Sequence, residues 1–333
     1  MKHFLLTAAA AAMVLALGSC AKTEVTDVPD SRYIGFDNAY IGNPTKSIDE
    51  ISSTTIDHFL VSGGYEGEQV FDNVEVTPNS NGVWTYSHLV PWVDEQTYKF
   101  YAYAPKTIKV EPTYNYTAGL TFTDFVVNGM QHQLDFVYDA SEDISSGVEG
   151  TVRPKVQFDF AHMLSMVQFT IKSGFPDDVT LTISDIKFYG MNSKNTLTNG
   201  TWGGAATEPI TDGSGNEITL TGGTAQATTG TATDYTNNCV VLPQNITGLE
   251  VRAKFKVTAT GESISTPEGV SKEITAVIPG ITWQQGYRYN YIVTIDGQTL
   301  DFITFDTPVV NEWTNQEIDM KNDESNAGQI IGA

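Results

Sequence analysis

Side chains that could perform chemistry are few in this sequence and form no recognisable catalytic or metal-binding set. No histidine has a second ligand at the spacing that metal sites use. The sequence also lacks the HExxH, GxSxG, P-loop and GxGxxG motifs. We therefore expect no enzyme activity, no cofactor and no metal ion. The histidines are His3, His58, His88, His132 and His162.

Acidic residues are abundant, and such residues can bind calcium or hydrolyse glycosides. The loop from Asp212 to Glu217, DGSGNE, lacks the glycine at the sixth position and the distal glutamate of an EF-hand. A hairpin turn rich in Gly, Asp and Asn explains this loop better. The number of acidic residues would allow the pair of carboxylates that a glycosidase needs, but no carboxylate lies in a sequence context typical of such an enzyme.

One residue near the N-terminus is placed for a covalent modification. Met1 to His3 form a short positive segment, and Phe4 to Leu17 form an apolar stretch too short to span a bilayer. The stretch ends in LGSC, which resembles the lipobox of bacterial lipoprotein precursors. Cys20 would become the new N-terminal residue, and its thiol would carry the diacylglycerol. We predict a signal peptide at 1–19 and a lipidated tether at 20–32; a conventional secretory signal is the alternative.

The segment YIGFDNAYI follows the tether and has the pattern of a strand. Ile34, Phe36 and Asn38 share one face of an extended chain, because side chains alternate along a strand. We predict a half-buried first strand from Tyr33 to Ile41 that covers an apolar groove.

A candidate protease site follows this strand. Gly42 to Pro44 break strand pairing and push the chain into a surface loop. The bond between Lys46 and Ser47 lies in this loop, and exposed loops are where proteases cut. Arg32 is the main rival as the basic residue before a cut. On the residues alone, an ordinary solvated lysine is the favoured interpretation of Lys46.

The charge of the chain excludes some partners. The 333 residues include 18 basic and 40 acidic side chains, a formal net charge of −22. Nucleic acids need clustered Lys and Arg, so they are excluded as partners, and anionic membrane surfaces would repel the protein. The second cysteine, Cys239, lies in the strand-like run NNCVVLPQ and is expected to be a small core residue. With Cys20 lipidated, no intramolecular disulfide can form.

From Tyr33 onward, short strand patterns separated by turn signals predict an all-β fold of two β-sandwich domains. In TYKFYAYAP both faces of the strand are rich in aromatic residues, which predicts a central strand. The acidic, Ser- and Gly-rich stretch YDASEDISSGVEGT has the composition of a linker. We therefore predict an N-terminal domain at 33–150 and a C-terminal domain with a tail at 151–333.

Three further patterns concern the second half of the chain. Alternating apolar residues indicate strands on both sides of AHMLS, and their parity differs, which predicts a bulge or tight turn from His162 to Ser165. The Gly-, Thr- and Asn-rich residues 193–237 predict long loops around one or two short strands. Residues 287–295 place three tyrosines, a valine and an isoleucine on one face of a last clear strand.

The ordered set of these stretches resembles the fimbrillin family, the lipoprotein-derived pilins of type V pili. The resemblance spans nearly the whole mature chain, and its most specific part is FDFAHMLSMVQF together with the lipobox. The other stretches that carry it are IGF followed by PTKS, VWTYSHLVPW with YKFYAYAP, QLDFVYDAS, CVVLPQ, and ITWQQGYRYNYIVTI with NEW.

The resemblance implies a structural role in a surface pilus. It implies two transthyretin-like sandwiches, export as a lipoprotein to the outer membrane, and partners that are other pilin subunits joined by strand exchange. It also implies a cut by an extracellular protease after a basic residue behind the first strand. The matching residue here is Lys46, with Ser47 as the new N-terminus, whereas the family usually has Arg. Family members serve as shaft, tip or anchor of the pilus.

The strand that is donated to a neighbouring subunit is predicted near the C-terminus. In residues 307–318 the side chains of Val309, Asn311 and Trp313 share one side of an extended chain. An equally favoured interpretation is that this segment is the last strand of its own domain. A different function also stays open, namely a monomeric surface lipoprotein or tip adhesin that binds glycans or a host protein. Trp202 is its candidate glycan-contacting residue, and local packing is the favoured interpretation of that side chain.

Overall fold

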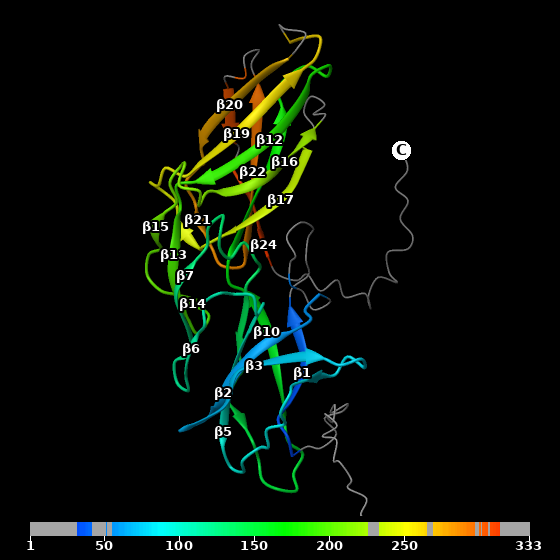
Figure 1. The fold of residues 1–333 in the computed structure, drawn as a ribbon, viewed down its shortest axis with the longest axis vertical. Helices are drawn as coiled ribbons and strands as arrows, with labels where there is room; N and C mark the ends of the chain where they lie inside the picture. Colours follow the sequence, from blue (N-terminus) through cyan, green and yellow to red (C-terminus); the bar gives the residue numbers. More distant parts are fainter. Residues whose placement is uncertain are drawn as a thin grey trace, which may run out of the picture.

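The computed structural model describes residues 32–41, 51, 55–225, 233–264, 269–296, 300, 302–305 and 307–313. In these residues the regular structure consists of strands, and the prediction of an all-β fold is confirmed. The molecule is elongated, with a lower and an upper half stacked end to end (Figure 1). Within the described part of the chain, no helix has the length and apolar character needed to cross a membrane.

The lower half is built on an eight-stranded sheet. Its first strand pairs in parallel with the second, and the other neighbours are antiparallel. In spatial order the strands are β1 (Gly35–Ile41), β10 (Lys155–His162), β8 (Val137–Ala140), β5 (Thr97–Ala104), β2 (Phe59–Tyr65), β3 (Glu68–Pro78) and β4 (Trp84–Thr85), with β9 (Ile144–Ser145) also paired to β5. The two outer strands, β1 and β4, lie against each other, so the sheet curls around the core between them.

The tight turn between β2 and β3 shows why this sheet forms locally. Tyr65 pairs with Glu68 across a two-residue turn, and Gly67 has a φ of 85°. Such a left-handed backbone conformation favours glycine, because a side chain there meets its own backbone. The turn fixes the register that directs the apolar residues of both strands to the core.

β5 is the central strand of the lower half, as its sequence predicts. Tyr98, Phe100 and Ala102 are buried in the core enclosed by the curled sheet. Tyr101 and Tyr103 are buried in a second core on the opposite face. The prediction that both faces of this strand are covered is therefore confirmed.

The second core is covered by a smaller sheet. Its strands are β14 (Thr201–Trp202), β13 (Asn192–Thr198), β7 (Gly119–Val126) and β6 (Thr113–Asn115), with β15 (Thr207–Pro209) also paired to β13. The prediction of loops around one or two short strands in residues 193–237 is wrong for this part. β13 is a full strand because it pairs with β7, and its buried Leu197 opposite Phe122 holds it to the core.

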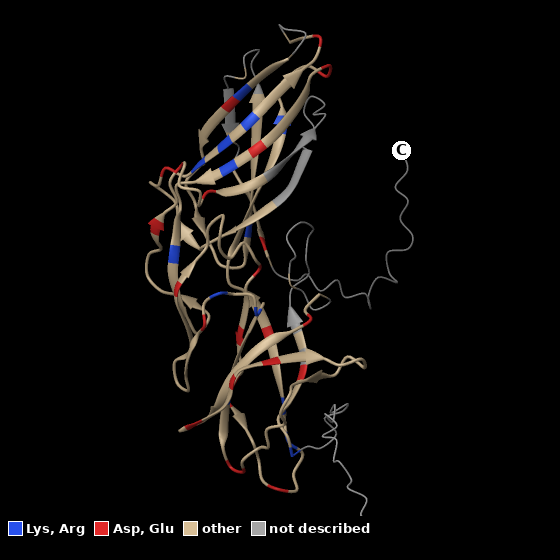
Figure 2. Ribbon diagram, in the orientation of Figure 1, with Lys and Arg blue, Asp and Glu red and all other residues tan. Residues whose placement is uncertain are grey.

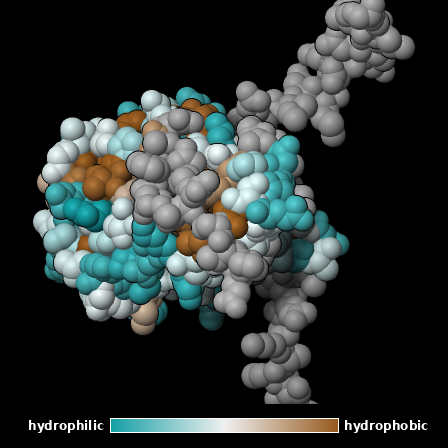
Figure 3. Space-filling model, turned by 90° about the horizontal axis from the view of Figure 1, so that it is seen from above, coloured by the Kyte–Doolittle hydropathy of each residue, from teal (hydrophilic) through white to brown (hydrophobic). Residues whose placement is uncertain are grey.

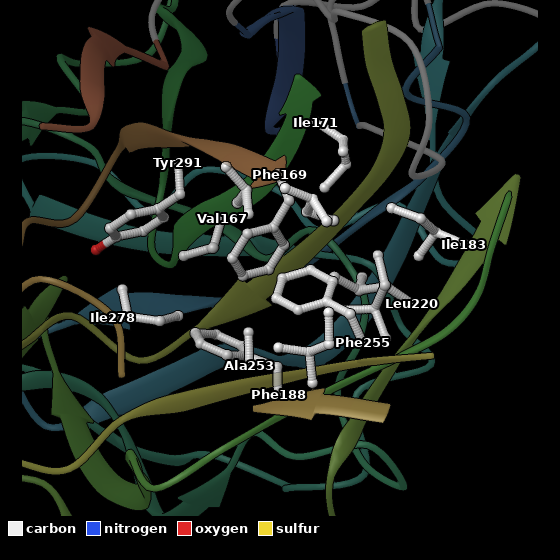
Figure 4. Close-up of a cluster of buried hydrophobic side chains, with 14 of the residues drawn as sticks. Val167, Phe169, Ile171, Ile183, Phe188, Leu220, Ala253, Phe255, Ile278 and Tyr291 are labelled. Carbon is white, nitrogen blue, oxygen red and sulfur yellow. The ribbon is translucent and has the colours of Figure 1, made fainter. Parts of the chain in front are cut away.

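The upper half is a sandwich of two sheets. One sheet contains β17 (Thr233–Val241), β11 (Ser165–Ser173), β22 (Tyr287–Asp296), β23 (Phe302–Phe305) and β24 (Val309–Glu312). The other contains β16 (Ile218–Ala225), β12 (Thr180–Tyr189), β19 (Arg252–Thr260) and β20 (Val270–Val277). A two-stranded ribbon of β18 (Gln244–Asn245) and β21 (Thr282–Trp283) completes it. Between the sheets, Phe169, Phe188 and Phe255 point toward one another, and Tyr291 lies beside Phe169 (Figure 4).

The chain passes from the lower to the upper half at Met163 and Leu164. β10 ends at His162 and β11 begins at Ser165, so the strand breaks where the sequence predicts a bulge or tight turn, but the break is a passage from one sheet to another. β10 itself completes the lower sheet, because it pairs with β8 and β1. Sheet membership and the predicted domain boundary at Gly150 therefore differ by this strand and by β13, β14 and β15, which share a sheet with β7. In the predicted linker, residues 144–145 form β9, which pairs with β5.

The charged residues of the upper sandwich compensate one another. Basic and acidic residues lie together on the outer face of β12, β19 and β20 (Figure 2). Lys254 lies 2.6 Å from Asp212 and 3.7 Å from Glu273. Seen from above, the described surface is largely hydrophilic, with separate apolar patches (Figure 3). Interspersed charges of both signs are typical of a sheet face that is exposed to water.

Candidate functional site

The predicted lipidation and processing residues, Cys20, Lys46 and Ser47, lie outside the described residues. The strand that precedes the predicted cut is described, and so is the candidate donor segment. The site is therefore built from β1, from the core beneath it and from β24.

β1 covers the lower core with a few large contacts. Ile34, Phe36 and Ala39 are buried, and Phe36 is only 3% exposed. Pairing with β10 shifts register between Phe36 and Ala39, so both side chains point inward despite their odd spacing. A first strand that buries part of its side chains is confirmed, although it begins at Gly35 rather than at Tyr33, and Ala39 is buried along with Phe36.

Phe36 is surrounded by aromatic rings. Its ring makes edge contacts with four rings at centroid distances of 5.5 to 6.3 Å and stacks on a fifth, that of Phe158, at 6.1 Å. Burial of such a side chain contributes about 1.5–3 kcal/mol, and favourable aromatic geometry adds to it. The four rings in edge contact belong to Phe59, Phe71, Tyr86 and Phe100.

The beginning of β1 is fixed by hydrogen bonds to the loop after β4. The Ile34 N–H donates to the Val90 carbonyl at 2.9 Å, and the Trp92 N–H donates to the Arg32 carbonyl at 2.9 Å. The Tyr86 hydroxyl donates to the Ile34 carbonyl at 2.8 Å. Burial raises the pKa of Tyr86 to about 12, so this hydroxyl stays protonated and can donate.

Loss of β1 would open a groove with a defined chemistry. One wall would be the backbone edge of β10 from Lys155 to Phe160, which now pairs with β1. The floor would be the aromatic pocket that Phe36 fills. At one end of the groove, the Val90 carbonyl and the Trp92 N–H would be left without their present partners at Ile34 and Arg32. Such a groove binds an extended chain, because it offers both unpaired backbone groups and an apolar pocket.

The candidate donor segment lies on β22 of its own chain. β24 pairs antiparallel with residues 287–290, and all four of its side chains are exposed, Val309 by 46% and Val310 by 41%. The three predicted donor residues are therefore not equivalent: Val309 and Asn311 are exposed, whereas Trp313 is only 2% exposed. The donor assignment stays a prediction, as does the cut after Lys46.

A buried polar cluster that the sequence does not reveal holds Trp313. The indole ring stacks on the imidazole of His162 at 4.2 Å with an interplanar angle of 8°. The Nδ1 atom of His162 lies 2.9 Å from Oδ1 of Asp135. These residues lie in three distant parts of the chain, so no local sequence signal could have brought them together.

The ring of His132 and the first residue of the loop DGSGNE make contacts with other residues of the protein. The His132 ring stacks on Phe125 at 4.4 Å, and its Nε2 accepts a hydrogen bond from the Lys109 N–H. Asp212 of the loop pairs with Lys254, which holds the pKa of this carboxyl below its usual range. Among the described residues, no group of three or more His, Cys, Asp or Glu side chains could hold a metal ion.

Two further predicted residues have packing roles. Trp202 is half-buried and donates its indole N–H to the Met163 carbonyl at 2.6 Å, with its ring against Phe125. Cys239 is buried in the upper core, and burial raises the pKa of its thiol. Cys239 is therefore an unreactive core residue, and the indole of Trp202 is engaged within the molecule.

Comparisons with known proteins agree with this architecture. A family model described as fimbrillin-like matches residues 47–313. A fimbrial protein from Bacteroides vulgatus has a similar fold, with a TM-score of 0.57 and 17% identity, over 85% of this chain and 100% of that chain. A search of curated proteins finds no match.

Two further solved structures match over most of the chain. One is a candidate cell adhesion protein from Bacteroides uniformis, with a TM-score of 0.48 and 19% identity, over 86% of this chain and 100% of that chain. The other is the fimbrial anchor protein Mfa2 from Porphyromonas gingivalis, with a TM-score of 0.33 and 9% identity, over 78% of this chain and 90% of that chain.

Proposed function

The chain belongs to the fimbrillin-like family, and from this premise we propose that it is a structural subunit of a surface pilus, assembled by strand exchange after a proteolytic cut. The observation that carries the proposal is the position of Phe36. This side chain, on a strand before the predicted cut, fills a pocket formed by five aromatic rings.

In this mechanism the cut after Lys46 separates β1 from the rest of the chain. β1 ends at Ile41, so all of its contacts belong to the fragment that leaves. The fragment also carries Cys20, the proposed lipid attachment site, so release from the outer membrane and opening of the groove are one event. Assembly before export is prevented, because an uncut subunit has no open groove.

The strand that enters the groove comes from a neighbouring subunit. It takes over the ladder along β10 and the backbone bonds at Val90 and Trp92, which are independent of sequence. The segment with Val309, Asn311 and Trp313 is the proposed donor. The four exposed side chains of β24 support this role, because apart from the buried Trp313 that follows them they give up little packing when the strand leaves.

Cleavage is tested with purified protein and a trypsin-like protease. We expect wild-type protein to give ladders of multimers that dissociate on boiling, with Ser47 as the first residue of the assembled subunits. Lys46→Ala should stay monomeric, whereas the matched variant Arg32→Ala should assemble normally. Polymers that begin at Tyr33 or at Cys20 would contradict the mechanism. Unchanged wild-type monomers would favour the alternative of a monomeric surface lipoprotein or adhesin.

Membrane attachment is tested separately. Cys20→Ala should abolish labelling by a palmitate analogue and leave the precursor unprocessed or soluble in the periplasm, because the thiol is the proposed acceptor of the lipid. Equal labelling of the variant and the wild type would rule out Cys20 as the lipid attachment site.

A further inference from the structure

The buried cluster at the junction of the two halves has a geometry that suits control of the C-terminal strand. We infer that Asp135 and His162 form a latch: the His162 ring holds Trp313 in place, and Asp135 couples the position of that ring to the position of the backbone at Ile51. The biological role of the latch rests on the proposed function, whereas its geometry and its first test do not. In this arrangement Asp135 and His162 are positioning residues for β24.

Asp135 links two separate segments. Its side chain is fully buried. Its Oδ1 lies 2.9 Å from Nδ1 of His162, and its Oδ2 accepts a hydrogen bond from the Ile51 N–H at 2.9 Å. A carboxyl group removed from water needs such partners, so the loss of one of them disturbs the other. The position of Ile51 and the orientation of the imidazole ring are therefore coupled.

The imidazole ring is the platform on which Trp313 rests. The two rings are nearly parallel, with centroids 4.2 Å apart. The backbone N–H of Trp313 donates to the Gly286 carbonyl at 2.6 Å. Neither Nε2 of His162 nor Nε1 of Trp313 has a hydrogen-bond partner among the described residues. Ring packing thus holds this side chain and a backbone bond holds its main chain, and the ring packing is sensitive to a rotation of the imidazole.

Trp313 is in turn the main packed contact of the C-terminal strand. The side chains of β24 are exposed, so its ladder to β22 and the burial of Trp313 retain it. Ile51 follows the predicted new N-terminus, Ser47, by only a short segment of chain. A cut after Lys46 frees that segment at one end. Opening of the groove and release of the donor strand, the two events of assembly, are therefore coupled through the contacts of Asp135.

The latch is tested first in the intact full-length chain, by amide hydrogen exchange read out by mass spectrometry. Asp135→Asn and His162→Ala should each speed exchange in residues 309–313 by about tenfold or more, because the first replaces the carboxylate that orients the imidazole and the second removes the ring on which Trp313 rests. Exchange in β11 and β12 should not change. His132→Ala is the matched control, since it also removes a buried histidine, one that stacks on Phe125 of the core that contains Trp313 and whose ring nitrogens bond to the backbone of Lys109 and Val126 rather than to Asp135.

The outcomes separate the latch from a general loss of packing. Exchange in residues 309–313 at the wild-type rate in both variants would overturn the inference, and so would equal acceleration by His132→Ala. If Asp135→Asn does not fold, His162→Phe decides, because it keeps a flat platform and loses the link to Asp135. Acceleration in His162→Phe supports the coupling, and the wild-type rate overturns it.

A second arm uses wild-type protein cut after Lys46. Exchange in residues 309–313 should rise on cutting, and cutting Asp135→Asn should add nothing further. A verified cut that leaves the wild-type rate unchanged would overturn the coupling to Ile51. Failure of any protease to cut at Lys46 would count against the proposed function, and the variants of the uncut chain would still decide the latch.

Discussion

β1 and β24 are both edge strands near the ends of the described chain, but they are held in opposite ways. β1 buries Phe36 and Ala39, together with Ile34 directly before it, in a core that it helps to enclose. β24 exposes all four of its side chains, and none of them belongs to the core of the upper sandwich. Removal of β1 therefore opens a core, whereas removal of β24 leaves its sandwich packed. This difference is what an acceptor and a donor of a strand require of one subunit.

The largest expected effect concerns the packing of β1. Phe36→Ala in the uncut protein should lower the free energy of unfolding of the lower half by about 3–5 kcal/mol, because it empties an aromatic pocket. Chemical denaturation measures this loss. Val310→Ala on β24 is the control and should change the free energy by less than about 0.5 kcal/mol. Losses of equal size would remove the distinction between the two strands.

Deletion of residues 307–333 should have a smaller effect on stability and a large one on assembly. The truncated protein loses the burial of Trp313, which costs about 2 kcal/mol, and should still unfold cooperatively as a monomer. It should not polymerise with itself after the cut. Mixed with wild-type subunits, it should shorten their ladders, because its groove still accepts a strand. An unfolded truncation product would mean that the segment belongs to its own core.

Much of this fold was accessible from the sequence because its strands alternate clearly. Val156, Phe158 and Phe160 are buried along β10, and the predicted inner face of β22 is buried from Tyr289 to Ile295. These patterns predict local structure well, because a strand with one buried face shows it as a simple alternation of apolar and polar residues. The aromatic faces of β5 likewise predict its central place.

The errors arose where distant pairing decides the structure. β13 has a polar sequence and forms a strand because β7 offers an edge to it. The pairing of β1 with β10 sets the register shift that lets both Phe36 and Ala39 be buried. The stacking of Trp313 on His162 depends on how the two halves meet. None of these features leaves a periodic signal in the local sequence.

Asp139 offers a pH-dependent test of how β10, the strand that pairs with β1, is held to β8. It lies on β8 and accepts a hydrogen bond from the Asp159 N–H of β10 at 2.7 Å. Burial raises the pKa of Asp139 to about 6, so folding favours the protonated form. Its contribution to stability is complete below its usual pKa and is lost as the pH rises through about 6.

Asp139→Asn should remove this loss while it keeps the acceptor for the Asp159 N–H. At pH 7 we expect the variant to be more stable than the wild type by about 1 kcal/mol, after allowance for solvent screening of a half-buried group. At pH 4 the two proteins should be equal. Denaturation across this pH range measures the difference, and Asp185→Asn on β12 is the control. Parallel curves for Asp139→Asn and wild type would disprove the assignment.

The smallest effect in the monomer is the most informative for the comparison. Val309→Thr and Val310→Thr keep the side-chain shape, and both valines are exposed, so each change should alter the stability of the monomer by less than about 0.5 kcal/mol. In the polymer the two should differ. Val309 shares the side of Asn311 and Trp313 that is predicted to enter the groove of the next subunit, and there a hydroxyl would be buried without a partner.

Val309→Thr should therefore lower the temperature at which the ladders dissociate, whereas Val310→Thr should leave it unchanged. Equal dissociation temperatures for both variants and the wild type would mean that β24 stays on its own β22 in the pilus. Another strand would then have to fill the pocket of Phe36.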